Sequence, residues 1–576
     1  MPEEVLLSPG VVAIENDQSF VTSQPIQAGA AIVGPAVKGP VGIPTVVTSY
    51  NDYVSKFGAT FLSGSNTYSY FTSISAYNYF QNGGLSLLVT RVVSGSFTPA
   101  TSSLIPDSGS LNNTFILETL SEGIIMNSTS PQNSDGTITS GSTDNLRWQV
   151  VSPDITTGTF TLLVRRGDDS TNSPTILESW GPLSLDPFSS NYIEKVIGNQ
   201  VENVANDGTD YYIQISGSYS NNSQYVRVKQ VNVTTPNYFD NSGTPKNEYT
   251  ASIPIAASGT FGAATGTNIP STAGKYYENI TDSIAGSQGI PAANYTESIY
   301  LLSNKDAYSF NFITVPGVIH GFSTGGYNTV ITLLNSICQN NGNTMAIIDT
   351  VGYGQNIGNI VSSVSNLNTS YAATYWPWLR TVDPGTGQQV WVPASTMIPG
   401  VYAFNDNVSA PWYAPAGVNR GVISNATMAE RYLTQGNRDD LYKVNINPIA
   451  TLPNTGIVVF GQKTLQKKAS ALDRVNVRRL LIELKNYITQ VADTLVFEQN
   501  TIATRNNFLL QVNPYLSSVQ QRQGLYSFRV VMDETNNTPQ VIDNNQLVGA
   551  IYLQPTKTAE FIYLTFNVTP TGVSFE

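Results

Sequence analysis

The sequence predicts a multidomain protein of mixed α+β and α/β class, in which a β-rich segment interrupts a discontinuous α/β domain. The chain has 576 residues, which is too long for one ordinary hydrophobic core. Strand-like and helix-like segments alternate before residue 95 and again after residue 300. Between them the chain is rich in Ser, Thr, Asn and Gly, with short alternating segments typical of antiparallel strands. We therefore expect an inserted β domain.

The first part of the α/β domain is expected over residues 24–95. A helix should begin at Ser49, whose hydroxyl can cap it, and end at Gly58. The other predicted elements are, in chain order, a small-residue strand after residue 29, a strand over 45–47, a helix over 68–80 and an apolar, buried strand over 85–93.

Residues 96–299 are expected to form a β-rich insertion of one or two subdomains. Polar and apolar side chains alternate in segments such as 159–166, 211–216 and 224–233. This alternation, broken by clusters of turn residues, is typical of antiparallel sheets with one face in solvent.

The second part of the α/β domain is expected over residues 300–440. Its strands and helices follow one another over residues 311–317, 328–340, 344–349, 357–367 and 371–379. This βαβαβ order predicts a parallel or mixed sheet covered by helices.

The Gly-rich turn 352–358, GYGQNIG, lies between a predicted strand and a predicted helix, as a dinucleotide-binding turn does. Its spacing is GxGxxxG, however, and no Asp or Glu follows before Val382 to hold a ribose hydroxyl. A nucleotide-binding enzyme that uses this turn is kept as an alternative.

Residues 441–558 are expected to form a compact α+β domain. Its predicted strands are 457–460, 525–533 and 547–555, and its predicted helices are 473–497 and 501–516. On the first helix, apolar residues recur at steps of four and three from Val477, which indicates one buried face. At about 100° per residue, Arg474, Arg478 and Lys485 fall within roughly 40° of each other beside that face.

Basic charge is segregated in this region. Residues 461–529 hold ten Lys and Arg against four Asp and Glu, whereas the whole chain has a net charge of −12. A basic helix face is often only solvated, but the segregation favours an acidic partner. The acidic total argues against nucleic-acid binding by the whole molecule.

Several classes of site are disfavoured by composition. His320 is the only histidine and Cys338 the only cysteine, so a multi-His metal site and a disulfide framework are excluded. The N-terminal residues Met1 to Glu4 lack the features of a signal peptide, and no apolar run of about 18 residues occurs. We expect no cofactor, no metal, no nucleic acid and no direct membrane insertion.

Both chain ends contain short β-prone runs that must pair with other strands to be stable. The N-terminal arm, residues 1–23, contains Val11 to Ile14, and the C-terminal arm, residues 559–576, contains 561–568 and 572–575.

Eight stretches of the sequence resemble the contractile tail sheath family of bacteriophages, to which the sheaths of R-type bacteriocins and type VI secretion systems are related. They are GAAIVGPAVKGPVGIPTVVTSYNDYVSKFG (29–58), YWPWL (375–379), PASTMIPGVYAFND (393–406), PWYAPAG (411–417), LYKVNINPI (441–449), GIVVFGQKTL (456–465), VNVRRLL (475–481) and AEFIYLTFNV (559–568). Their shared order is more specific than any one of them, and residues 96–299 match no family.

The resemblance implies a non-enzymatic subunit of a helical sheath of stacked rings, with an inner α+β domain built from both chain ends and a variable outer insertion. Such sheaths surround an inner tail tube, contact baseplate and tail terminator proteins, and belong to virion tails assembled in the host cytoplasm. The residues implied in strand exchange between subunits are Val11, Val12, Ile14, Phe561, Tyr563, Thr565, Asn567 and Val568. Those implied in basic contacts with the tube are Lys467, Lys468, Arg474, Arg478 and Lys485.

Three alternatives stay open beside a phage sheath. The resemblance extends to bacteriocin-like and secretion sheaths, and a nucleotide-binding enzyme would use the turn at 352–358. A tail-fibre or surface adhesin would use the β-rich middle, but no internal repeat of the kind common in fibrous trimers is evident.

Overall fold

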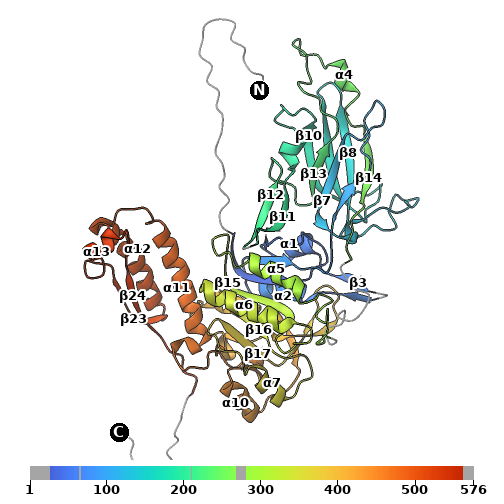
Figure 1. The fold of residues 1–576 in the computed structure, drawn as a ribbon. Coiled ribbons are helices and arrows are strands. Elements are labelled where there is room, and N and C mark those ends of the chain that lie inside the picture. The colour runs from blue at the N-terminus through green and yellow to red at the C-terminus, as the bar shows by residue number, and fades with distance from the viewer. Residues whose placement is uncertain (1–25, 64–65, 209, 268–279, 562–576) are drawn as a thin grey trace, which may run out of the picture.

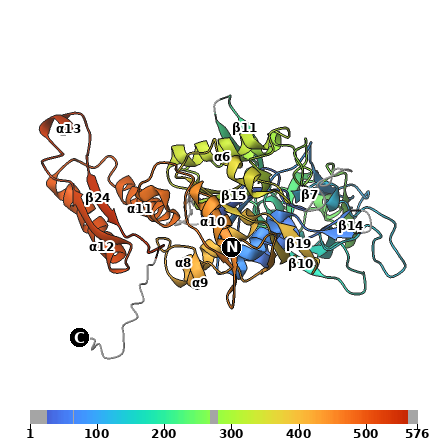
Figure 2. The same ribbon diagram turned by 90° about the horizontal axis from the view of Figure 1, so that it is seen from below.

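The computed structural model describes residues 26–63, 66–208, 210–267 and 280–561. Within these ranges the protein is a mixed α/β multidomain molecule with several separate sheets (Figures 1 and 2).

The largest sheet has eight strands and is assembled from segments far apart in the sequence. Its order is β2-β5-β1-β15-β16-β17-β21-β22, with parallel pairing from β5 to β21 and an antiparallel strand at each edge. The strands are β1 (Ile26–Gly34), β2 (Thr45–Val47), β5 (Leu87–Arg91), β15 (Tyr308–Ile319), β16 (Met345–Asp349), β17 (Ala372–Trp376), β21 (Asn447–Leu452) and β22 (Gly456–Val459). Residues 24–95 and 300–440 therefore contribute to one sheet, which also takes in β21 and β22 beyond residue 440.

Helices cover both faces of this sheet, which explains its continuous apolar strands. In β1, Ala30 and Ile32 face one hydrophobic core, and Ala31 and Val33 face the other. The first core contains α1 (Tyr50–Phe57), α2 (Phe71–Gln81) and α8 (Ala394–Val408); the second contains α5 (Ala293–Leu301), α6 (Tyr327–Asn341), α7 (Ile357–Ser363) and α10 (Gln435–Lys443).

Local signals place α1 as the sequence predicts. The backbone N–H of Asp52 donates to Ser49 Oγ at 3.1 Å, which satisfies one of the free donors of the first turn. Gly58 ends the helix at a φ of 74°, where a side chain would be strained.

The insertion contains a seven-stranded antiparallel sheet of order β10-β9-β8-β14-β6-β7-β13. Its strands are β6 (Pro99–Ser102), β7 (Phe115–Glu122), β8 (Leu146–Asp154), β9 (Thr159–Arg166), β10 (Ile176–Ser184), β13 (Val226–Val231) and β14 (Ala257–Gly262). The insertion also contains a separate hairpin, β11 (Val201–Asn206) with β12 (Tyr211–Ser216), and the short helices α3 (Ile193–Ile197) and α4 (Asn247–Thr250). In Figure 1 the hairpin lies between the large insertion sheet and α5.

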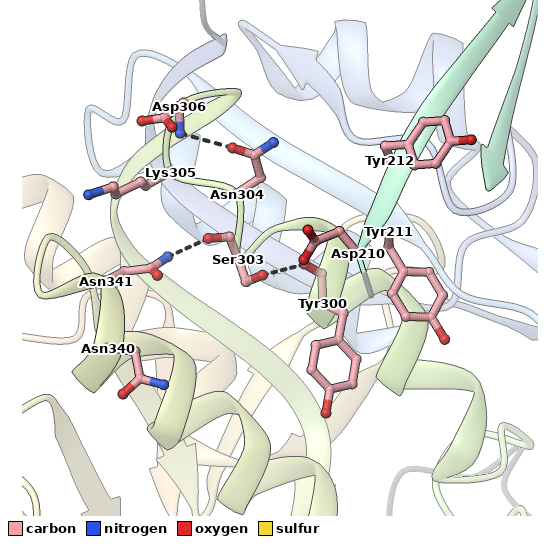
Figure 3. Close-up of a pocket in the computed structure, with 10 residues that line it drawn as sticks. All are labelled: Asp210, Tyr211, Tyr212, Tyr300, Ser303, Asn304, Lys305, Asp306, Asn340 and Asn341. Atoms are coloured by element: carbon pink, nitrogen blue, oxygen red, sulfur yellow. Dashed lines mark hydrogen bonds between the residues drawn. The ribbon is translucent and has the colours of Figure 1, made fainter. Parts of the chain in front are cut away.

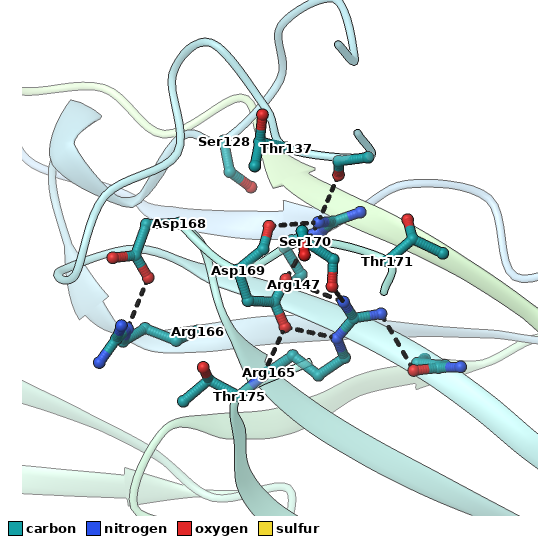
Figure 4. A network of polar contacts seen from close by, with 12 residues as sticks. Ser128, Thr137, Arg147, Arg165, Arg166, Asp168, Asp169, Ser170, Thr171 and Thr175 are labelled. Carbon is teal, nitrogen blue, oxygen red and sulfur yellow. Dashed lines mark hydrogen bonds and ion pairs between the residues drawn. The ribbon is translucent and has the colours of Figure 1, made fainter. Parts of the chain in front are cut away.

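A buried ion cluster fastens two loops of the insertion (Figure 4). The Asp169 carboxylate, which is fully buried, pairs with Arg165 at 2.7 Å and with Arg147 at 3.0 Å. The same carboxylate accepts the backbone N–H of Thr175, and Arg147 donates to the Gly136 carbonyl. The cluster thus links strands β8 and β9 to the loop before β8 and to the loop after β9.

Residues 475–555 form a unit of their own beside the large sheet, at the red end of the chain in Figure 1. It consists of α11 (Val475–Asp493), α12 (Ile502–Gln521), β23 (Leu525–Val531), α13 (Pro539–Asp543) and β24 (Ala550–Pro555), around a core that includes Leu484, Phe508 and Leu516. Smaller elements elsewhere in the chain include the hairpin β3 (Phe61–Ser63) with β4 (Asn66–Tyr68), helix α9 (Gly417–Arg420), and the small sheet of β18 (Leu379–Val382), β19 (Gln389–Val392) and β20 (Ala426–Ala429).

Candidate assembly surface

Strands β23 and β24 form a two-stranded antiparallel sheet that has no third strand among the described residues. Phe528 and Leu553 contact the small core beneath it, whereas Tyr526 and Tyr552 are 59% and 63% exposed. An isolated pair of strands is marginally stable, and its outer edges offer free backbone N–H and C=O groups. This pair of strands is therefore suited to receive further strands.

The chain leaves β24 and passes the start of α11, where Glu560 holds it. The Glu560 carboxylate accepts hydrogen bonds from Arg474 Nε at 2.7 Å, from the Tyr442 hydroxyl at 2.7 Å and from Gln462 Nε2 at 3.1 Å. Burial raises the pKa of Tyr442, and the nearby Glu560 raises it further. These contacts fix where the C-terminal segment begins.

Most of the residues predicted for strand exchange cannot be placed. Phe561 lies in the described part, and its side chain is 69% exposed. The others lie outside the described residues, namely Val11, Val12, Ile14, Tyr563, Thr565, Asn567 and Val568.

The two arginines predicted to contact a tube make contacts inside the chain. Arg474 pairs with Glu560 and also with Asp473, at 3.0 Å. Arg478 is only 3% exposed; its guanidinium lies 3.9 Å from the ring centre of Tyr371 and donates to Ser370 Oγ. Burial lowers the pKa of Arg478. The periodicity correctly placed Arg478 on α11, whereas Arg474 lies just before the helix in an extended conformation. Both side chains contact other parts of the chain.

The three predicted lysines remain at the surface. Lys467, Lys468 and Lys485 are all exposed. Lys467 donates from Nζ to the Ser365 carbonyl, and Lys485 Nζ lies 3.4 Å from the Tyr371 hydroxyl. The structure thus separates the five basic residues into two inward arginines and three outward lysines.

Arg479 is a structural contact that the sequence did not single out. It is 4% exposed, pairs with Asp406 of α8 at 2.5 Å, and lies 4.5 Å from the ring centre of Tyr402. The partners are 73 residues apart in the sequence, so no local spacing could have revealed the pair. Together with Arg478, it attaches α11 to the large sheet domain.

The Gly-rich turn at 352–358 has an acidic side chain where a phosphate would have to lie. Glu430 Oε1 accepts the backbone N–H of Gly354 at 2.6 Å. Burial raises the pKa of Glu430, and the bond from Gly354 opposes that effect. A carboxylate at this N–H repels an anion when it is ionised, so the turn lacks the open donors of a phosphate cradle.

The remaining sequence candidates are buried or isolated. Cys338 is buried in α6, and its burial raises the pKa of its thiol to about 12. Burial lowers the pKa of His320. The described residues contain no group of three or more His, Cys, Asp or Glu able to hold a metal. No helix in the described ranges is long and apolar enough to cross a membrane.

Comparisons with known proteins place this surface in a family context. The phage tail sheath protein central domain matches residues 288–465, and the phage tail sheath C-terminal domain matches residues 467–569. The tail sheath protein of Vibrio phage KVP40 is 40% identical over 218 residues, which are 38% of this chain and 32% of that protein. The tail sheath protein of Enterobacteria phage T4 is 37% identical over 233 residues, 40% of this chain and 35% of that protein. The chain thus matches about a third of the length of these curated relatives.

The fold is shared with a solved sheath structure. The crystal structure of the sheath tail protein from Listeria innocua aligns over 92% of this chain and 95% of that one, with 10% identity and a TM-score of 0.50. Residues 288–465 and 467–569 of the chain therefore match the central and C-terminal domains of the phage tail sheath family.

Proposed function

We propose that the protein is the structural subunit of a contractile phage tail sheath, which polymerises helically around an inner tail tube and contracts to drive the tube through the host envelope. The observation that carries this proposal is the two-stranded β23–β24 sheet, which has no further strand at either edge among the described residues. Arms from neighbouring subunits would add strands to it, and main-chain hydrogen bonds would hold them. Because this contact is head-to-tail and does not close on itself, it generates a filament.

The proposed domain organisation follows the same logic. Residues 1–23 and 559–576 act as arms, 24–95 with 300–440 form the α/β domain, 96–299 form the outer insertion, and 441–558 form the inner domain. Strand β21 pairs with β17, and β22 pairs with β21, which favours moving the boundary between the α/β and inner domains to the start of α11.

The surface lysines are the better candidates for contact with an acidic tube. Lys467, Lys468 and Lys485 are exposed, whereas Arg474 and Arg478 are engaged in the chain. Exposed ion pairs contribute about 0–1 kcal/mol each and weaken with salt. Weak, repeated contacts suit a tube that must slide free. In this scheme the arginines position α11, and no residue performs covalent chemistry.

The wider assignment rests on the family. The proposed partners are further copies of this chain, the tube protein, and baseplate and tail terminator proteins, in a virion tail assembled in the host cytoplasm. A bacteriocin-like or secretion sheath is the alternative within the same family.

Truncation tests the strand-exchange step. Chains lacking residues 1–20 or 561–576 should remain folded, as measured by circular dichroism. They should form no hollow sheath polymers in negative-stain microscopy. A control deletion of residues 268–279, which lie in the insertion, should leave tube length unchanged. Tubes of normal length from either arm truncation would contradict the proposal.

Charge reversal tests the tube contact. The triple variant Lys467→Glu, Lys468→Glu, Lys485→Glu should no longer assemble around the inner tail tube. It should still polymerise into sheath that contains no inner tube. Lys443→Glu, a charge reversal of an exposed lysine on α10, serves as the control. Unchanged sedimentation of the triple variant with tubes would rule out the lysine contact without affecting the strand-exchange proposal.

A further inference from the structure

A pocket of about 430 Å³ lies where the insertion hairpin meets the helices of the large sheet domain (Figure 3). The start of β12 provides one wall, and the C-terminal ends of α5 and α6 with the loop after α5 provide the other. Its size lies within the range of small-ligand sites. Nothing in the proposed sheath function uses it.

Tyrosine rings form the apolar part of the pocket. Tyr211 of β12 stacks on Tyr300 of α5, with ring centres 5.7 Å apart and planes 9° apart. Tyr300 remains 42% exposed, so it keeps ring surface open to a ligand. The stack holds Tyr211 and Tyr300 in fixed positions, which lowers the entropy cost of binding against them.

Polar groups surround these rings, and several have free hydrogen-bonding atoms. The carboxylate of Asp306 and the side-chain amide of Asn340 have no hydrogen-bond or ion-pair partner among the described residues. Asn304 uses its carbonyl oxygen to accept the backbone N–H groups of Asp306 and Ala307, which leaves its NH₂ group available. Asp210 adds a second carboxylate. Donors and acceptors are thus both present within one open pocket.

This combination matches the chemistry of a sugar. A hexose presents C–H groups on one face, which pack on aromatic rings, and hydroxyls at its rim, which both donate to carboxylates and accept from amides. Two aspartates and one lysine, Lys305, give the pocket an acidic balance, which disfavours uronic or sialic acids. We propose that this pocket binds a neutral hexose unit of an oligosaccharide.

The site is composite, because neither unit forms it alone. Tyr211 and Asp210 come from the insertion, and Tyr300, Asn304 and Asp306 come from the sheet domain. A bound sugar would therefore also hold the β11–β12 hairpin against α5. This gives the proposal a second readout that does not depend on sheath assembly.

The test is titration of the full-length protein with maltohexaose, cellohexaose and chitohexaose, followed by saturation-transfer NMR and calorimetry, with polygalacturonate as the acidic probe. At least one neutral probe should bind and should protect the β11–β12 hairpin from hydrogen exchange. Tyr300→Ala and the nearly isosteric Asp306→Asn should each weaken binding at least about tenfold, or 1.4 kcal/mol. The matched controls Tyr432→Ala and Asp543→Asn, exposed residues outside the pocket, should bind normally.

Three results would overturn the proposal. The first is the absence of binding by all three neutral probes, and the second is equal binding by the pocket variants and the wild type. The third is loss of tube formation by Asp306→Asn without any sugar binding, which would identify the pocket as a contact between subunits instead. Because sugar titration uses unassembled subunits, its failure is distinct from failure of the sheath proposal.

Discussion

At two sites in the protein, arginine side chains pair with an aspartate. The two sites differ in the segments that they join and in the solvent exposure of the carboxylate. Arg147 and Arg165 meet Asp169 inside the insertion, where that carboxylate is 0% exposed. Arg479 meets Asp406 between α11 and α8, where the carboxylate is 28% exposed. A buried charge that loses its partner costs far more than a partly hydrated one. The insertion cluster therefore fixes one unit internally, whereas the α11 pair is a weaker joint between units.

Removal of the Asp169 charge should have the largest effect on stability. Asp169→Asn leaves two buried guanidinium groups without their carboxylate and should destabilise the insertion by about 3–5 kcal/mol. Urea unfolding and limited proteolysis of the loops near Gly136 and Thr175 measure the effect. The adjacent pair of Asp168 and Arg166 is 30–39% exposed, so Asp168→Asn should cost at most about 1 kcal/mol. Equal losses of stability in the two variants would refute the predicted difference between buried and solvent-exposed ion pairs.

Loss of Arg479 should have an intermediate effect, confined to the joint. Arg479→Met keeps the apolar stem against Tyr402 but removes the bond to Asp406, at an expected cost of about 1.5–3 kcal/mol. Faster proteolysis between residues 466 and 475, with an intact insertion, is the expected readout. Gln490→Met, an exposed change on the same helix, provides the control. A global loss of stability, including the insertion, would mean that the joint is not a separate element.

A second buried carboxylate, Asp349, extends the comparison because Ser395, rather than an arginine, supplies its two hydrogen bonds. Oδ1 accepts the Ser395 N–H at 3.0 Å and Oδ2 accepts the Ser395 hydroxyl. Burial raises the pKa of Asp349 to about 7, against the effect of these bonds.

The raised pKa of Asp349 makes stability depend on pH with a defined sign. Between its ordinary pKa near 3.8 and about 7, the folded protein keeps a proton that the unfolded chain releases. Stability contributed by this group should thus be fully present below pH 3.8, fall by up to about 1.4 kcal/mol per pH unit, and level off above pH 7. Asp349→Asn should remove this slope in chemical denaturation from pH 5 to 8. An unchanged difference between variant and wild type across that range would show that Asp349 stays ionised.

The sequence predicted the elements whose signals are local. Ser49 and Gly58 bound α1 as expected, and the apolar run at 85–93 became β5, in which every residue is buried. The βαβαβ order after residue 300 correctly indicated parallel strands. These features depend on the residues within each element, so a single sequence is enough to predict them.

The destination of the basic side chains could not be predicted in this way. Helical periodicity predicted Arg474 and Arg478 on one side of a helix, but α11 begins only at Val475, and whether these side chains meet solvent depends on the rest of the fold. Tyr371, which covers Arg478, lies 107 positions earlier, and Asp406 lies 73 positions before Arg479. A long-range partner leaves no trace in local spacing. The open edges of the β23–β24 sheet also could not be predicted, because the sequence does not show which strands lack neighbours.

Strand β1 has a consequence for the order in which the chain folds. It pairs with β5 on one side and with β15 on the other, and the whole insertion is synthesised between β1 and β15. At about 5–20 residues per second, tens of seconds pass before β15 leaves the ribosome. During that interval the insertion can fold. The edge of β1 that will pair with β15 stays unpaired, and its apolar side chains stay exposed. We therefore expect nascent chains to be most prone to aggregation before residue 319 has emerged, and least prone once the sheet can close.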